Sequence, residues 1–255
     1  MIHVILDDNT KIKYDTFDKI TKHDKIIKLY CSHNKLTCSP DLINNLINLK
    51  TLHCSNNKLT FLPESIGNLI NLESLYCSNN KLISLPESIG NLVNLETLYC
   101  HGNQLTLLPE SINNLINLKY LDCSNNKLIF LPESIGNLIN LEKLYCVDNK
   151  LTELPDSMGN LINLKYLDCS DNKLTSLPES IGNLTKLEKL SCSFNKIKEL
   201  PETIINLKNI NIFYKDELTL TPQQERYFKW IKLNKNYPFD EHVDTVLVKC
   251  AYFGV

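Results

Sequence analysis

Cysteine recurs every 23 residues along most of this 255-residue chain. A fixed period of about 20 to 50 residues indicates a repeat architecture, in which each repeat is one unit of structure and contacts only its neighbours. Eight such units run from residue 26 to residue 209, and a degenerate ninth begins at Ile210. The cysteines of the series are Cys31, Cys54, Cys77, Cys100, Cys123, Cys146, Cys169 and Cys192.

The repeat itself predicts a strand followed by a turn. The unit that begins at Leu72 reads L-E-S-L-Y-C-S-N-N-K-L-I-S-L-P-E-S-I-G-N-L-V-N. Leu75 and Cys77 alternate with polar or aromatic residues, so both point to one face of a short strand. One unit cannot bury its leucines alone, but stacked units bury them in a continuous core. We therefore interpret the repeated Cys as a small apolar core residue, not as a disulfide or a metal ligand.

The L-x-x-L-x-C-x-x-N-x-L half of the unit resembles the leucine-rich repeat. The L-P-E-S-I-G-N-L half resembles the Ras-suppressor-like and plant intracellular Ras-group-related subclass. The resemblance implies an α/β solenoid, a horseshoe with a parallel concave sheet and short convex helical or 3₁₀ turns. It also implies a role in binding.

One Asn recurs where the chain must leave each strand. A side-chain amide both donates and accepts hydrogen bonds, so it can pair the backbone groups of a buried bend. We interpret this series as a structural ladder, which consists of Asn34, Asn57, Asn80, Asn103, Asn126, Asn149, Asn172 and Asn195. A later Gly, as in Gly67 and Gly90, is expected to end each convex turn in a left-handed conformation, with Asn in its place at Asn44 and Asn113.

The solvent-facing strand positions vary between repeats that are otherwise nearly identical. Tyrosine is frequent there, and it is enriched at interface hot spots because it offers a large rigid contact area with a polar tip. Tyrosine also has good strand propensity, which is the structural alternative. The predicted partner-binding residues are Tyr30, His53, Tyr76, Tyr99, His101, Tyr120, Asp122, Lys143, Tyr145, Tyr166, Asp168 and Lys189. Tyr214 is expected to continue the same row.

The two ends of the solenoid should be capped, because an open stack exposes its core. Residues 1–25 are assigned to an N-terminal cap, with a hairpin over residues 2–14 and a short helical segment after it. Residues 210–255 are assigned to a ninth strand, a helix that starts at Thr221-Pro222 and a tail. The apolar residues of this helix are expected to pack over the last repeat, namely Tyr227, Phe228, Trp230, Ile231 and Leu233. Residues 243–255 either pack on this cap or bind a partner.

Composition removes several classes of function. The formal charge of -2 gives no electrostatic reason to expect nucleic acid. We find no glycine-rich phosphate loop or catalytic motif, so we expect no enzyme, no cofactor and no metal. Cys100 and His101 are adjacent in a strand, so their side chains face opposite sides of it. The thiol and the imidazole therefore cannot act together as a catalytic nucleophile and its general base. Without a signal sequence or a membrane span, we expect a cytoplasmic monomer that does not bind membranes.

Two functions remain open. The first is a protein-protein interaction scaffold that binds another protein on its concave face. The alternative is a substrate-recognition subunit of a multi-protein enzyme complex, such as a ubiquitin ligase or a phosphatase, which would borrow its activity from a partner.

Overall fold

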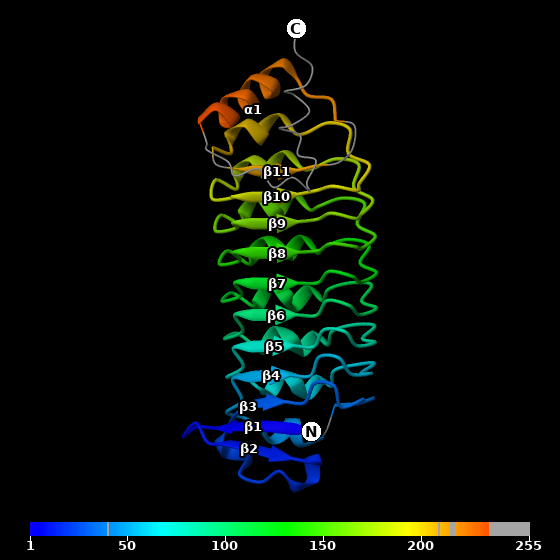
Figure 1. Cartoon of the computed structure of the whole chain (residues 1–255), viewed down its shortest axis with the longest axis vertical. Coiled ribbons are helices and arrows are strands. Elements are labelled where there is room, and N and C mark those ends of the chain that lie inside the picture. The colour runs from blue at the N-terminus through cyan, green and yellow to red at the C-terminus, as the bar shows by residue number, and fades with distance from the viewer. Residues whose placement is uncertain (40, 209, 215–217, 235–255) are drawn as a thin grey trace. The chain divides into compact units, whose positions relative to one another are not determined.

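The computed structural model describes residues 1–39, 41–208, 210–214 and 218–234. The chain divides into two compact units, Met1–Leu128 and Ile129–Val255. Each unit contains one sheet, with the repeats of that unit stacked along it (Figure 1).

The first unit contains a sheet that is parallel except at its N-terminal edge. Strands β3 to β7 are parallel, and each residue pairs with the residue 23 positions later, as Leu52 does with Leu75. The expected hairpin is present, because β1 pairs antiparallel with β2, and β1 also pairs with β3. The strands are β1 (Ile2–Leu6), β2 (Lys11–Tyr14), β3 (Ile26–Tyr30), β4 (Thr51–His53), β5 (Ser74–Tyr76), β6 (Thr97–Tyr99) and β7 (Tyr120–Asp122).

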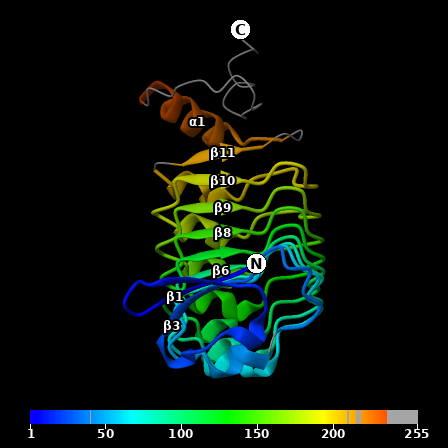
Figure 2. The ribbon, with the colours of Figure 1, turned by 60° about the horizontal axis from the view of Figure 1, so that its bottom comes forward.

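Short 3₁₀ turns lie on the side opposite the strands (Figure 2). The residue before the turns that begin at Glu64, Glu87 and Glu110 is a Pro in extended conformation, as Pro63 is at φ -69° and ψ 152°. Proline fixes φ and has no N–H to leave unpaired, so it suits the start of a helical turn. The turns of this unit are η1 (Phe17–Lys19), η2 (His23–Lys25), η3 (Asp41–Asn45), η4 (Glu64–Asn68), η5 (Glu87–Asn91) and η6 (Glu110–Asn114).

The second unit repeats this plan and ends in an α-helix. Its strands β8 to β11 are parallel. Its elements are η7 (Glu133–Asn137), β8 (Lys143–Tyr145), η8 (Asp156–Asn160), β9 (Tyr166–Asp168), η9 (Glu179–Asn183), β10 (Lys189–Ser191), η10 (Glu202–Asn206), β11 (Asn211–Phe213) and α1 (Pro222–Asn234). The predicted class, a parallel sheet with short turns opposite, is confirmed in each unit.

Helix α1 begins with the expected capping box. The Thr221 hydroxyl accepts from the Gln224 N–H at 3.2 Å, and the Gln224 side chain accepts from the Thr221 N–H at 3.0 Å. The same Gln224 amide donates to the carbonyls of Leu200 and Pro201, each at 3.1 Å, so α1 pairs backbone groups of the last repeat. Phe228 is buried, as expected of a side chain that packs over that repeat, whereas Trp230 is 55% exposed. Residues 243–255 lie outside the described residues.

Strand β11, which belongs to the ninth repeat, begins one residue earlier than the period predicts. Ile212 pairs with Leu190, 22 positions before it, whereas Leu190 pairs with Leu167, 23 positions before it. A shift of one residue moves every side chain of a strand to the opposite face. Phe213 therefore occupies the outward position, and Tyr214 is buried, where its hydroxyl donates to the Ile197 carbonyl. The expectation for Tyr214 was wrong.

The eight periodic cysteines are buried free thiols, as predicted. Burial raises the pKa of Cys31 and of Cys77 to about 12. Because only the thiolate is a good nucleophile, these side chains are unreactive at neutral pH. Cys38, which is not in the series, is exposed.

Alkylation is expected to separate these two classes of cysteine. At pH 7 to 8, iodoacetamide should label Cys38 in the native protein, and the eight buried thiols should react only after denaturation. Peptide mass spectrometry after native and then denaturing labelling measures this. Rapid native labelling between Cys77 and Cys169 would contradict the assignment of these residues to the core.

The ladder Asn side chains pair the backbone of neighbouring repeats. The Asn103 carbonyl oxygen accepts from the Leu82 N–H at 3.0 Å, and its amide donates to the carbonyls of Cys77 and Cys100 at 3.1 and 2.9 Å. Corresponding bonds recur at Asn57, Asn80, Asn126, Asn172 and Asn195. Asn34 and Asn149 donate to the carbonyls of Ser32 and Cys146. Each such Asn therefore holds the bend that ends a strand.

The glycines of the 3₁₀ turns serve close packing, not a left-handed turn. Among the described residues Gly102 is the only glycine with positive φ, at 65°. A Cβ atom at Gly67 would lie 2.5 Å from the carbonyl oxygen of Ser88 in the next repeat, which is too close for any side chain. Left-handed residues instead precede the ladder Asn, as Asn56 and Asn79 do at φ 56° and 53°.

Candidate functional site

Aromatic rings line the outward face of the first unit's sheet. Tyr30 and His53 stack with their ring centroids 4.6 Å apart, and His53 stacks on Tyr76 at 4.0 Å. Tyr99 meets Tyr76 edge to face at 5.3 Å. Residues of equal position pair across β3 to β6, so the 23-residue period sets this spacing. We call Tyr30, His53, Tyr76 and Tyr99 the ring ladder.

The ring ladder is half-buried, and its rings cover one another. His53 has a ring on each face, so its imidazole meets solvent at the edge. Burial lowers the pKa of His53, and the positive charge of Lys28 lowers it further. The ladder therefore presents ring edges and polar tips, a surface that combines apolar contact with hydrogen bonding.

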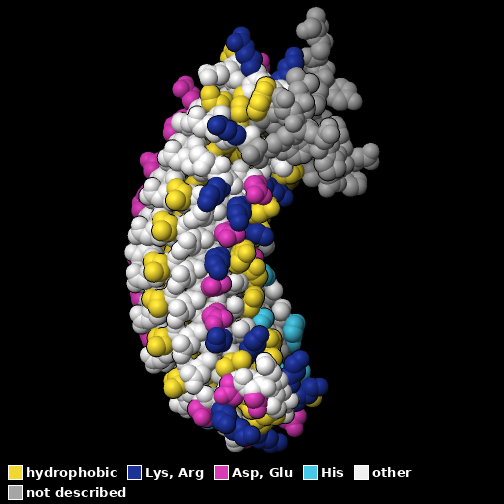
Figure 3. All heavy atoms as spheres, turned by 90° about the vertical axis from the view of Figure 1, so that its left-hand side faces the viewer, with side chains coloured by type: hydrophobic (Ala, Val, Ile, Leu, Met, Phe, Trp, Pro, Cys, Tyr) yellow, Lys and Arg dark blue, Asp and Glu magenta, His cyan; other side chains and the backbone are white. Residues whose placement is uncertain are grey.

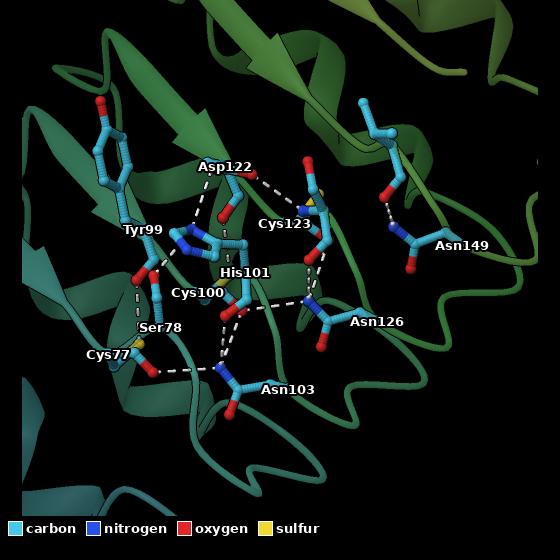
Figure 4. Close-up of polar contacts among 12 residues, drawn as sticks. Cys77, Ser78, Tyr99, Cys100, His101, Asn103, Asp122, Cys123, Asn126 and Asn149 are labelled. Carbon is cyan, nitrogen blue, oxygen red and sulfur yellow. Dashed lines mark hydrogen bonds and ion pairs between the residues drawn. The ribbon is translucent and has the colours of Figure 1, made fainter. Parts of the chain in front are cut away.

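His101 follows the ring-ladder residue Tyr99 by two positions and makes two polar contacts (Figure 4). Its Nδ1 lies 3.0 Å from the Ser78 hydroxyl and 3.1 Å from an Asp122 carboxylate oxygen. A carboxylate only accepts, so this nitrogen carries the hydrogen. The sequence did not predict this cluster, because it joins three different repeats.

Ser78, His101 and Asp122 are the residue types of a catalytic triad, but their geometry differs from one. In a triad, Ser and Asp bind opposite nitrogens of the imidazole, so that the free nitrogen activates the hydroxyl. Here both contact Nδ1, and Ser78 is only 3% exposed. The arrangement orients an imidazole and does not activate a nucleophile.

Tyr120 completes the predicted residues of the first unit. It pairs with Thr97, and Asp122 pairs with Tyr99, so both lie on the face that carries the ring ladder. The structure thus places seven of the predicted partner-binding residues on one sheet face, namely Tyr30, His53, Tyr76, Tyr99, His101, Tyr120 and Asp122.

The other five predicted residues lie on the outward face of the second unit. They are Lys143, Tyr145, Tyr166, Asp168 and Lys189. The Lys143 ammonium lies 4.9 Å from the centre of the Tyr166 ring, a cation–π distance. The Tyr166 hydroxyl donates to the Glu188 carboxylate at 3.1 Å, which raises the pKa of Tyr166. This face is charged and mixed in sign.

The sequence analysis missed two carboxylates at the border of the second face. Asp148 and Asp171 are left-handed residues at φ 51° and 54°. Burial raises the pKa of Asp171, and the negative charges of Asp148 and Asp168 raise it further. In the part of the chain that the structure describes, no group of three or more His, Cys, Asp or Glu side chains could hold a metal ion.

A second feature that the sequence analysis missed is a row of exposed apolar side chains away from the strands. Hydrophobic side chains form such rows along each unit (Figure 3). In the first unit, the row between the 3₁₀ turns and the strands consists of Ile47, Ile70, Val93 and Ile116, which are 44 to 55% exposed. The sequence shows this row as an Ile or Val that recurs at one position of the repeat whose side chain does not enter the core.

No described helix is both long and apolar enough to cross a membrane.

Family models of the leucine-rich repeat match consecutive parts of the chain. A single-repeat model matches residues 48–69, a two-copy model matches residues 70–115 and 116–157, and a leucine-rich repeat region model matches residues 156–229. None of the curated proteins compared with the chain matches it.

Solved structures with the same fold include a leucine-rich repeat protein of Leptospira interrogans, with 36% identity and a TM-score of 0.72 over 77% of this chain. The ectodomain of the Arabidopsis thaliana receptor kinase GASSHO1/SCHENGEN3, in complex with CASPARIAN STRIP INTEGRITY FACTOR 2, has 31% identity and a TM-score of 0.68 over 76% of this chain. The plant peptide hormone receptor RGFR1, in complex with RGF2, has 26% identity and a TM-score of 0.59 over 71% of this chain. The chain spans 50%, 25% and 34% of these proteins, respectively.

Proposed function

Because the chain belongs to the leucine-rich repeat family, we propose that it is a non-catalytic scaffold that binds a protein partner on the outward face of its strands. Two of the similar structures are receptor complexes with a peptide hormone or a named factor, which supports a protein or peptide as the partner.

The observation that carries this proposal is the ring ladder of the first unit. Tyr30, His53, Tyr76 and Tyr99 place four rings side by side over four repeats on a surface that the core does not require. Aromatic residues are enriched where a protein surface makes its strongest contacts, because they bury much area and lose little side-chain entropy. Next to them, Asp122 orients the His101 imidazole, a polar group that can set the register of a partner.

Affinity capture tests the proposal. The wild-type chain and a variant with Ala at Tyr76, Tyr99 and Tyr120 are used as baits, and bound proteins are quantified by mass spectrometry. We expect the variant to lose the partners that the wild type captures. A variant that retains them all would overturn the proposal.

We propose two finer assignments. We place the chain in the Ras-suppressor-like subclass, on the strength of the L-P-E-S-I-G-N-L half of its repeats, and in the cytoplasm. The free thiols of the buried cysteine series support this compartment, because cytosolic proteins keep their cysteines reduced.

A further inference from the structure

The N-terminal strands add positive charge to the face that carries the ring ladder. In β1 and β2 the register pairs Lys13 with His3 and Lys11 with Ile5. His3 in turn pairs with Tyr30, and Ile5 with Lys28, so these side chains share the outward face. Lysine and histidine side chains gather at this end on the strand side (Figure 3).

Negative charge is scarce on the same face. Among the outward residues of β1 to β7 that the structure describes, Asp122 is the only carboxylate, against three lysines. Both oxygens of Asp122 are already in use, since one accepts from the Ser124 N–H at 3.0 Å and the other lies 3.1 Å from His101 Nδ1. The lysines therefore have no carboxylate opposite them on this face.

The charges that border the face are balanced. Lys50 pairs with Glu73 at 2.8 Å, and Lys119 pairs with Glu96 at 3.0 Å. This border row therefore adds no net charge to that of Lys11, Lys13 and Lys28. An excess of one sign on a surface attracts partners of the opposite sign and speeds their encounter.

The packing of the rings favours a peptide over a nucleic acid. Single-stranded nucleic acids bind to protein sheets by stacking their bases on free aromatic faces. Both faces of His53 are covered, by Tyr30 and Tyr76, and Tyr76 also meets Tyr99. The exposed ring edges and hydroxyl groups suit the side chains and amides of a polypeptide instead.

We infer that the first unit's sheet face binds an acidic segment of the partner protein, with the carboxylates of that segment over Lys11, Lys13 and Lys28 and its apolar side chains along the ring ladder. The inference rests on the proposed function and names the chemistry of the partner.

Selection from a phage-displayed library of random dodecapeptides on the full chain tests this inference. Selected peptides should be enriched in Asp and Glu. When they are synthesised and measured by fluorescence anisotropy, their affinity should fall as the salt concentration rises, because exposed charges are screened. A 12-residue oligouridine should bind more weakly than the selected peptides.

A charge-reversed variant with Lys11→Glu, Lys13→Glu and Lys28→Glu should bind the selected peptides at least about tenfold more weakly, which corresponds to about 1.4 kcal/mol. The control variant carries Lys58→Glu, Lys81→Glu and Lys127→Glu, which change the net charge equally at exposed positions outside this face. It should keep the wild-type affinity, and thermal melts should show that both variants fold.

Three results would overturn the inference. They are selected peptides without an excess of Asp and Glu, equal losses in the two lysine variants, and oligouridine that binds more tightly than the peptides. If non-acidic peptides bind and the Ala variant at Tyr76, Tyr99 and Tyr120 loses them, the inference fails while the proposed function stands. If neither the tyrosine nor the lysine changes affect binding, both fail.

Discussion

Replacing Tyr76, Tyr99 and Tyr120 together with Ala is expected to weaken binding of the protein partner by about three orders of magnitude or more. Aromatic residues near the centre of an interface typically contribute about 2 kcal/mol each, and three orders of magnitude correspond to about 4 kcal/mol. Folding should change little, because the three side chains lie on the solvent side of the sheet and the core leucines stay in place. Isothermal titration calorimetry with the captured partner measures the affinity, and circular dichroism measures the fold.

The matched control removes three side chains from the opposite side of the same unit. Asn68→Ala, Asn91→Ala and Asn114→Ala change exposed residues in η4, η5 and η6. The glutamates that begin these turns are less suitable, because Glu64 accepts from the Ser88 N–H at 3.2 Å. If the Asn variant loses the partner and the Tyr variant keeps it, the binding face lies on the side of the 3₁₀ turns.

Replacing Asn103 with Ala is expected to lower the free energy of unfolding by about 3 kcal/mol. The change leaves the Leu82 N–H without its acceptor, and it removes donors from the carbonyls of Cys77 and Cys100. Asn103 is almost fully buried, so water does not readily replace these bonds. An unpaired buried polar group costs about 1 to 3 kcal/mol, which places the total at the upper end of that range or above it. Chemical denaturation followed by circular dichroism measures the loss.

The control for this prediction is Asn125→Gly. Asn125 is exposed and has a φ of 52°, and glycine adopts this conformation without strain. We expect its unfolding midpoint to stay close to the wild-type value. Equal midpoints for Asn103→Ala and Asn125→Gly would mean that the ladder does not stabilise the bends.

The sequence predicted the parts of the fold that depend on period alone. A strand alternates its side chains every two residues, and the repeat returns every 23, so the burial of Cys77 and the outward position of Tyr76 follow from counting. The capping box at Thr221 was also predictable, because its hydrogen bonds join residues three apart in the sequence.

Errors arose where a local rule competes with packing between repeats. Gly67 was expected to be left-handed, but its lack of a side chain is needed for Ser88 of the next repeat. The position of Tyr214 was predicted wrongly because the last repeat is one residue shorter than the others. Since side chains alternate between the two faces of a strand, a shift of one residue moves Tyr214 from the outward face to the core.

The contact of His101 with Asp122 could not be predicted from the sequence. The two residues are 21 positions apart, and their contact depends on the strand register and on the side-chain rotamers together. The same is true of the charge on the sheet face, since Lys13 and Lys11 reach it only through the antiparallel hairpin. A signal existed for the exposed apolar row, because Ile47, Ile70 and Val93 share one repeat position that faces no core.

Site-specific photo-crosslinking tests the central claim, that the partner binds the outward sheet face, most directly. Benzoylphenylalanine is placed at Tyr76 on the sheet face, at Val93 in the exposed apolar row, or at Asn91 on the 3₁₀ side, and each chain is irradiated with the captured partner. Our account predicts a strong crosslink from position 76 and none from position 91 or position 93. A crosslink from position 91 or 93 together with none from position 76 would contradict it.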